Sequence, residues 1–210
     1  MSLQGRVGLF GGTFNPLHNA HLKVAHVALD QCGLSEVVFI PNGIPPHKPL
    51  EPGVDREDRL SMVEEAIADD PRLSVSRIEV DREGPSYTID TIRALAHDYP
   101  QGICFIIGAD RLLQIETWKE PEALLRSVPF VLAPRAGVDM RLFREPPFDK
   151  TELTMLEMDE VDLSSTHLRA RIRRGEAIEE WVPASVAKYV AEHGLYRHGE
   201  RELIRSRTGG

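Results

Sequence analysis

The stretch that decides the fold is Arg6-Val7-Gly8-Leu9-Phe10-Gly11-Gly12-Thr13-Phe14-Asn15-Pro16-Leu17-His18-Asn19-Ala20-His21. It begins as an apolar run typical of a buried strand, and the residues after His21 have the amphipathic spacing of a helix. A strand that ends in small residues and leads into a helix presents free backbone N–H groups and the positive end of the helix dipole. His18 and His21 are three residues apart and share one face of the first helical turn. The stretch therefore predicts a phosphate site.

Apolar β-rich runs alternate with helical periodicity along the rest of the chain. The expected strands are 6–11, 37–40, 73–80, 103–107, 130–132 and 153–158, and the expected helices are 19–32, 56–69, 87–98, 111–118, 165–174 and 183–192. This order predicts an α/β protein with a Rossmann-like, doubly wound, mostly parallel sheet, helices on both faces and a small C-terminal helical part. Ligands bind in such folds beyond the carboxyl ends of the strands, where the strand order reverses. The first turn lacks the GxGxxG fingerprint, which argues against an NAD-dependent oxidoreductase.

The composition fits one globular domain. The chain has 210 residues, of which 41% are hydrophobic and 28% charged, and its net charge is −8. We expect a single domain over residues 1–196 and a flexible tail over 197–210. The sequence shows neither an apolar run of membrane-spanning length nor a signal-peptide pattern, so we expect a cytoplasmic protein. A net negative charge argues against sequence-blind nucleic-acid binding, so an anionic ligand needs a local site.

The cysteines and most histidines have ordinary structural interpretations. Cys32 and Cys104 fall in apolar segments, and we expect both to be reduced and buried. No His/Cys cluster has the spacing of zinc ligands. The remaining histidines are expected on the surface or in packing, namely His26, His97, His167, His193 and His198.

A second anion-binding pattern lies at Leu163-Ser164-Ser165-Thr166-His167-Leu168-Arg169. Its hydroxyl residues predict a helix N-cap, and the hydroxyls, exposed N–H groups and guanidinium at such an end suit an anion. An ordinary capped helix with a surface arginine is the common alternative. The arginines further along, Arg171, Arg173 and Arg174, fit a solvated helix face balanced by nearby acids.

Both patterns resemble motifs of the nucleotidyltransferase superfamily. Residues 11–21 are similar to its GTFxPxHxGH signature, with Ala20 in place of a glycine, and residues 164–169 are similar to its SSTxIR motif, with Leu168 in place of isoleucine. The resemblance implies that the two histidines bind the phosphates of a nucleoside triphosphate and that the later motif closes the triphosphate site. Two such motifs in the right order are far more specific than either alone.

Three further stretches, residues 41–49, 85–91 and 108–119, resemble the bacterial nicotinate-nucleotide adenylyltransferases. With the two motifs they span residues 7–196. The resemblance implies an enzyme that joins ATP and nicotinate mononucleotide into nicotinate adenine dinucleotide and pyrophosphate in NAD biosynthesis. It also implies Mg²⁺ carried by ATP through the triphosphate oxygens and water, which need no carboxylate cage. The oligomeric state stays open, a homo-oligomer included.

The resemblance assigns roles to individual residues. The implied catalytic residues are His18, His21 and Arg169. The implied ATP site comprises Gly11, Gly12, Thr13, Phe14, His18, His21, Gly108, Asp110, Ser164, Ser165, Thr166 and Arg169. The implied nicotinate mononucleotide site comprises Asn42, His47, Lys48, Thr88, Trp118 and Lys119. An aromatic plate suits a pyridine ring, and hydroxyl and N–H donors suit a carboxylate.

Each role has a structural alternative, and other functions stay open. Trp118 fits a core aromatic, Thr88 and Asn42 fit caps, and the Pro-rich loop 41–54 fits either a functional flap or a slack surface loop. The acceptor could be nicotinamide mononucleotide or phosphopantetheine, although transferases for the latter usually carry threonine at the position of His18. A non-catalytic nucleotide-binding regulator is another alternative. A metal hydrolase would lack a third ligand and the glutamate of HExxH.

Overall fold

The computed structural model describes residues 2–46, 52–160 and 163–197 of the chain. His47, Lys48 and His198 lie outside the described residues, as does the predicted tail except for its first residue. No described helix is both long and apolar enough to span a lipid bilayer.

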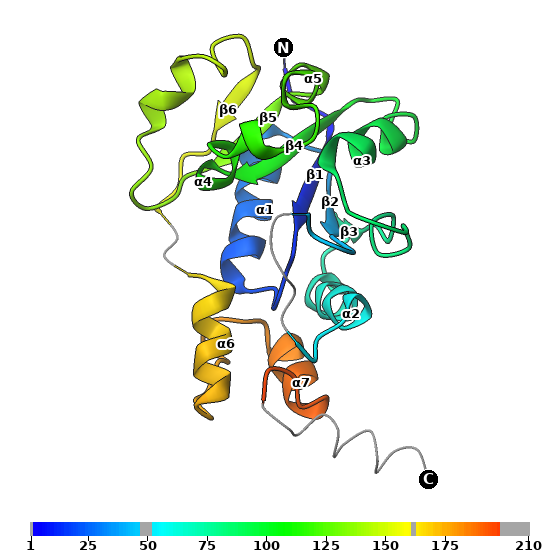
Figure 1. Cartoon of the computed structure of the whole chain (residues 1–210), viewed down its shortest axis with the longest axis vertical. Coiled ribbons are helices and arrows are strands. Elements are labelled where there is room, and N and C mark those ends of the chain that lie inside the picture. Colours follow the sequence, from blue (N-terminus) through cyan, green and yellow to red (C-terminus); the bar gives the residue numbers. More distant parts are fainter. Residues whose placement is uncertain (1, 47–51, 161–162, 198–210) are drawn as a thin grey trace.

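A six-stranded parallel sheet forms the centre of the protein, in the order β3-β2-β1-β4-β5-β6. The strands are β1 (Val7–Gly12), β2 (Glu36–Pro41), β3 (Leu73–Val75), β4 (Ile103–Gly108), β5 (Phe130–Ala133) and β6 (Leu153–Met155) (Figure 1). The order reverses at β1, which pairs with β2 on one side and β4 on the other. The prediction of a doubly wound parallel sheet is confirmed, and the reversal places the expected ligand crevice beyond β1 and β4.

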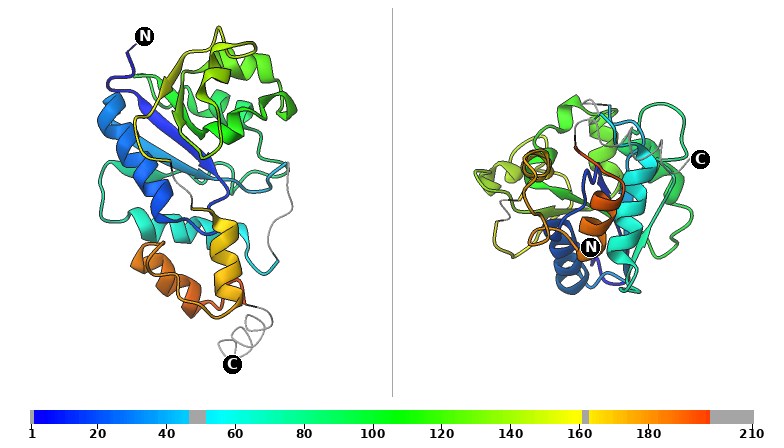
Figure 2. Two further views of the ribbon diagram at one scale, coloured as in Figure 1. Left: turned by 90° about the vertical axis from the view of Figure 1, so that its left-hand side faces the viewer. Right: turned by 90° about the horizontal axis from the view of Figure 1, so that it is seen from below.

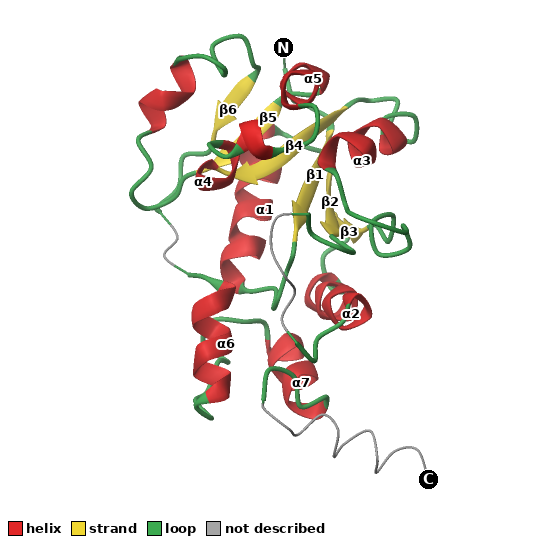
Figure 3. Cartoon of the chain, in the orientation of Figure 1, coloured by secondary structure: helices red, strands yellow, loops and turns green. Residues whose placement is uncertain are grey.

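Helices cover both faces of this sheet (Figure 3). They are α1 (Asn19–Cys32), α2 (Arg56–Ile67), α3 (Thr88–Leu95), α4 (Ala109–Leu112), α5 (Pro121–Ser127), α6 (Ser165–Arg173) and α7 (Ala184–Glu192), with short 3-10 helices η1 (Ile115–Thr117) and η2 (Met140–Arg144). The helices α6 and α7 lie together at one end of the molecule, which confirms the small C-terminal helical part (Figure 2).

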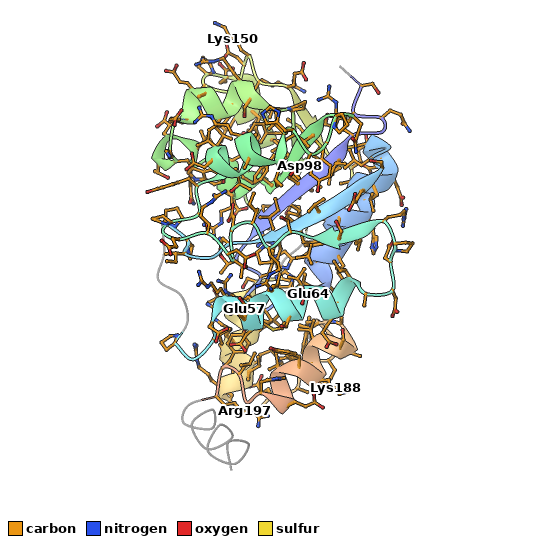
Figure 4. All side chains as sticks on the ribbon, turned by 90° about the vertical axis from the view of Figure 1, so that its right-hand side faces the viewer. Glu57, Glu64, Asp98, Lys150, Lys188 and Arg197 are labelled. Carbon is orange, nitrogen blue, oxygen red and sulfur yellow. The ribbon has the colours of Figure 1, made fainter. Side chains whose placement is uncertain are left out.

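The core has two parts because successive strand residues point to opposite faces of the sheet. In β2, Val37 and Phe39 belong to the apolar cluster that includes α1, α2, α6 and α7, whereas Val38 and Ile40 belong to the cluster beneath α3 and α5. Side chains fill the space between these layers, and charged residues such as Glu64 and Lys188 lie on the outside (Figure 4). Cys32 and Cys104 are free and buried, as predicted.

Local signals in the sequence set the helix ends. In α2, Asp55 Oδ1 accepts a hydrogen bond from Asp58 N and Asp58 Oδ2 accepts one from Asp55 N, both at 2.9 Å. This capping box fixes the first turn of α2. The helix α7 packs against α2, and Ser185 Oγ donates a hydrogen bond to Glu65 O at 3.0 Å. In α1, the left-handed Gly33 (φ 64°) ends the helix.

Several predicted boundaries are wrong. The third strand ends at Val75 rather than at residue 80, because Val80 is buried in a turn after the strand and not by strand pairing. The last strand ends at Met155 rather than at residue 158. The helix predicted over 111–118 is divided into α4 and η1, and α5 was not predicted although it starts at a proline, a residue favoured in the first helical turn.

Candidate active site

A cavity of about 490 Å³ lies at the carboxyl ends of the central strands, where Gly11 and Gly12 end β1 and Gly108 ends β4. Every predicted site residue that the structure describes lines this cavity. They are Gly11, Gly12, Thr13, Phe14, His18, His21, Asn42, Thr88, Gly108, Asp110, Trp118, Lys119, Ser164, Ser165, Thr166 and Arg169. Only His47 and Lys48, outside the described residues, are not placed by the structure.

The turn after β1 explains why small residues precede Phe14. A Cβ atom on Gly12 would lie 2.7 Å from Cζ of the Phe14 ring, so a larger residue would displace that ring. Phe14 itself has the left-handed φ of 46°, which the packing of its buried ring holds in place. Its ring meets His21 edge-on, with 5.1 Å between centroids. The turn therefore sets the position of His21.

The two histidines form a stacked pair at the start of α1. Their ring centroids are 3.7 Å apart with 20° between the planes. The backbone N–H of His18 donates to Nδ1 of His21 at 3.3 Å, which leaves Nε2 of a neutral His21 as the protonated donor. Nδ1 of His18 is buried and has no hydrogen-bond partner among the described residues. Both rings line the cavity and can serve a ligand there.

Both histidines are held neutral at physiological pH. Burial lowers the pKa of His18 to about 4, and the positive charge of Arg135 contributes to the shift. Burial also holds the pKa of His21 well below its usual value, with smaller contributions from His18 and Arg135. The pair therefore offers neutral N–H donors to a phosphate and does not depend on a protonated imidazolium.

The start of α6 lies against the turn between β1 and α1. Ser165 Oγ donates to Pro16 O at 3.0 Å, and Arg169 Nη1 donates to Asn15 O at 2.9 Å. Ser164 caps the helix by accepting from His167 N at 3.3 Å. The two anion-binding patterns, far apart in the sequence, thus contact each other and face one cavity.

The other side of the cavity is built by the residues after β2, the start of α3 and the segment after η1. Asn42 follows β2, Thr88 opens α3, and Trp118 is partly buried against the apolar cluster beneath α3 and α5. Lys119 Nζ donates to both carboxylate oxygens of Asp90, at 2.8 and 3.0 Å. The ammonium of Lys119 is thus already paired at the rim of the cavity.

Sequence reasoning missed Arg135, Arg111 and Glu79, all of which line the cavity. Arg135 follows β5 at its carboxyl end, a position that could have marked it as a ligand-binding candidate. Its Nε lies 3.8 Å from Asp110 Oδ1. Among the described residues that line the cavity, the charged ones are four cations, Arg111, Lys119, Arg135 and Arg169, and two acids, Glu79 and Asp110. This chain of net charge −8 therefore has a locally cationic cavity, as an anionic ligand requires.

The described residues include no group of three or more His, Cys, Asp or Glu side chains placed to hold a metal ion. Of the carboxylates that the structure places in the cavity wall, Glu79 accepts a hydrogen bond from Thr91 and Asp110 lies near Arg135.

Comparison with known proteins gives consistent matches. The family model described as cytidylyltransferase-like matches residues 9–171. A Symbiobacterium thermophilum protein named "Probable nicotinate-nucleotide adenylyltransferase" is 44% identical over 201 residues, covering 93% of this chain and 97% of its own. A Thermus thermophilus protein of the same name is 42% identical over 194 residues, covering 91% and 100%.

Among solved structures, the Plasmodium falciparum nicotinic acid mononucleotide adenylyltransferase complexed with NaAD superposes with a TM-score of 0.77. It is 17% identical and the match covers 92% of this chain and 98% of that one, a likeness that shows the fold. The parallel sheet and the cationic cavity at its switch point are those of an α/β nucleotidyltransferase. By its sequence matches, the chain belongs to the nicotinate-nucleotide adenylyltransferases of the cytidylyltransferase-like family.

Proposed function

We propose that this chain transfers the adenylyl group of ATP to nicotinate mononucleotide, giving nicotinate adenine dinucleotide and pyrophosphate in NAD biosynthesis. The observation that carries the proposal is the contact between the two phosphate-binding patterns, through the Ser165–Pro16 and Arg169–Asn15 hydrogen bonds, at one cationic cavity. The names of relatives at 42–44% identity support it. So does the complex of the structurally similar Plasmodium enzyme with NaAD.

The reaction needs no nucleophile from the protein. A 5′-phosphate oxygen of the mononucleotide forms a bond to the α-phosphorus of ATP, and the bond from that phosphorus to the bridging oxygen breaks. The bonding electrons leave with pyrophosphate. The protein contributes alignment of two anions and stabilisation of the charge that grows on the leaving group.

The ATP half of the cavity supplies donors for the triphosphate. In this proposal, His18 and His21 donate from neutral imidazoles, and Arg169 and the free N–H groups at the start of α6 hold the departing pyrophosphate. The turn residues Gly11, Gly12, Thr13 and Phe14 place the backbone close to the phosphates. Gly108 and Asp110 lie by the nucleoside, where the Asp110 carboxylate accepts from ribose hydroxyls.

The acceptor half supplies an aromatic plate and short polar side chains. Trp118 stacks on the pyridine ring, and the Thr88 hydroxyl donates to the nicotinate carboxylate. Asn42 Oδ1 accepts from Arg59 at 3.3 Å, which leaves its Nδ2 as the donor for the ligand. Lys119, whose ammonium is paired with Asp90, donates to the mononucleotide from the rim of this half. Contacts by His47 and Lys48 remain predictions from the sequence.

Mg²⁺ carried by ATP would neutralise charge on the triphosphate. The described residues provide no carboxylate cage, so we propose that the triphosphate oxygens and water hold the ion. A cytoplasmic location and the boundary of the domain at residue 196 likewise remain predictions from the sequence.

The proposal is tested by pyrophosphate release from ATP with three acceptors: nicotinate mononucleotide, nicotinamide mononucleotide and phosphopantetheine. We expect the largest kcat/KM for nicotinate mononucleotide. A larger value for either other acceptor would assign a different transferase. Binding of ATP without pyrophosphate release with any of the three would contradict an enzyme and favour a nucleotide-binding regulator.

A further inference from the structure

Arg59 is a fully buried arginine in α2, with 0% of its surface exposed. It is the largest side chain among the described residues that is enclosed to this degree, and it does not line the cavity. Its neighbours in the helix, Leu60, Met62 and Val63, are apolar core residues. An arginine at such a position is unusual, because long cationic side chains are almost never fully buried without a paired charge.

The guanidinium of Arg59 joins the turns that follow two neighbouring strands. Nη1 donates to Thr13 O at 3.0 Å, in the turn after β1, and to Asn42 Oδ1 at 3.3 Å, after β2. Nη2 donates to Gly43 O at 2.9 Å. Thr13 belongs to the proposed ATP half of the cavity, whereas Asn42 belongs to the acceptor half. One side chain therefore connects the ATP half and the acceptor half of the cavity through hydrogen bonds.

Hydrogen bonds connect Arg59, through Gly43, to the residues just before α3. Gly43, whose carbonyl accepts from Arg59, donates its N–H to Ser86 Oγ at 3.0 Å. A Cβ atom on Gly43 would lie 2.2 Å from Glu79 O, so the backbone there is packed too closely for any other residue. Ser86 lies two residues before Thr88, the proposed donor to the nicotinate carboxylate. The position of the acceptor half therefore depends on Arg59 through the hydrogen bonds of Gly43.

Burying the guanidinium of Arg59 has a cost in stability. Among the described residues, no carboxylate lies within the 4.0 Å ion-pair distance of its guanidinium, and Nε has no hydrogen-bond partner. Burial lowers the pKa of Arg59, which reflects the cost of removing this charge from water, and the nearby Tyr196, Asp55, Asp58 and Glu79 offset only part of this shift. Apolar residues that fill the same volume are often equally or more stabilising than a buried charge. An apolar residue, however, could not donate hydrogen bonds to the three acceptors on these two active-site turns.

We propose that Arg59 is a positioning residue that keeps the ATP half and the acceptor half of the cavity in register. The inference rests on the proposed function, because only a reaction between two bound substrates needs such a register. Arg59 contacts neither substrate; it fixes Thr13, Asn42 and Gly43 relative to one another. A ligand that spans both halves depends on this register, whereas a ligand in one half does not.

The test compares the binding of linked and separate ligands in Arg59→Met. Calorimetry measures the Kd of ATP alone, of nicotinate mononucleotide alone and of nicotinate adenine dinucleotide, which spans both halves. Joining two ligands raises affinity only when both subsites are in the right relative position. We expect dinucleotide binding to weaken about tenfold or more and kcat to fall about 100-fold, while each single-substrate Kd changes less than about threefold.

Two further variants separate positioning from folding and from charge. Val63→Ala, a buried residue of the same helix that makes no polar contact with either turn, should lower Tm and leave the linked-to-separate affinity ratio unchanged. Arg59→Lys keeps the charge but cannot span the three acceptors with the planar fork of arginine, so we expect it to remain impaired in the same ratio. It also carries the test if Arg59→Met does not fold.

Three results would overturn the inference. The first is an unchanged ratio of dinucleotide affinity to single-substrate affinity in folded Arg59→Met. The second is an equal loss of this ratio in Val63→Ala, and the third is full activity of Arg59→Lys. Failure of the proposed function itself would appear separately, as a wild-type protein that forms no dinucleotide.

Discussion

His18 gives a stability prediction whose size follows from the structure. The residue is 3% exposed, and its pKa in the folded protein is about 4, below the ordinary value of 6.5, because burial and Arg135 disfavour the imidazolium. Between those two values only the unfolded chain binds the proton. Stability from a neutral buried His18 is therefore complete above pH 6.5 and is lost as the pH falls toward 4.

The magnitude can be worked out for unfolding at pH 8 and pH 5. Each pH unit over which only the unfolded state is protonated is worth about 1.4 kcal/mol, so His18 should lower the free energy of unfolding by about 2 kcal/mol at pH 5 relative to pH 8. His18→Gln keeps a polar side chain and removes the titration. We expect the wild type to lose about 2 kcal/mol more than this variant over the same interval.

Urea unfolding followed by circular dichroism at both pH values measures the difference. The carboxylates and the other histidines titrate in both proteins, so their contributions largely cancel in the comparison. Parallel losses of stability in the wild type and in His18→Gln would show that His18 titrates equally in the folded and unfolded chain. That result would refute the lowered pKa of His18 and with it the conclusion that burial holds this ring neutral.

Three other variants or reagents test separate parts of the site and the core. Arg169→Met should lower kcat for pyrophosphate release roughly 100-fold, because no guanidinium then stabilises the charge on the leaving group. A near-normal kcat would show that Arg169 does not take part in the reaction. Trp118→Ala should raise KM for nicotinate mononucleotide about tenfold and leave KM for ATP unchanged in steady-state kinetics, and equal changes in both would argue against stacking on the pyridine. Burial raises the pKa of Cys104 to about 12, so mass spectrometry should find it alkylated by iodoacetamide only after unfolding, and rapid labelling of the folded protein would contradict this.

The features encoded by local spacing were predictable from the sequence. The alternation of apolar runs and amphipathic segments indicates the parallel sheet, and the glycines before His18 indicate a phosphate-binding turn. The hydroxyl residues before Arg169 indicate a helix start that can bind a second anionic group. That these two segments meet did not follow from spacing; it depends on the β1–β4 switch point and on the bond from Ser165 to Pro16.

The features that depend on long-range packing were not predictable. Val80 has the apolarity of a strand residue, yet it is buried in a turn, so its apolarity gave too long a predicted strand. Arg59 lies in a helix, where an arginine normally faces solvent, and its three acceptors come from distant segments. Arg135 follows a strand end, but the sequence alone does not show that its charge acts on the two histidines. These side chains complete the site through contacts that only the fold creates.

A crystal structure of the protein with a non-hydrolysable ATP analogue is the sharpest test of whether the two anion-binding patterns serve one ligand. We expect one triphosphate that contacts the turn of residues 11–18 and His21 on one side and the start of α6 with Arg169 on the other. A triphosphate bound by only one of these segments, with the other facing solvent, would contradict the shared site.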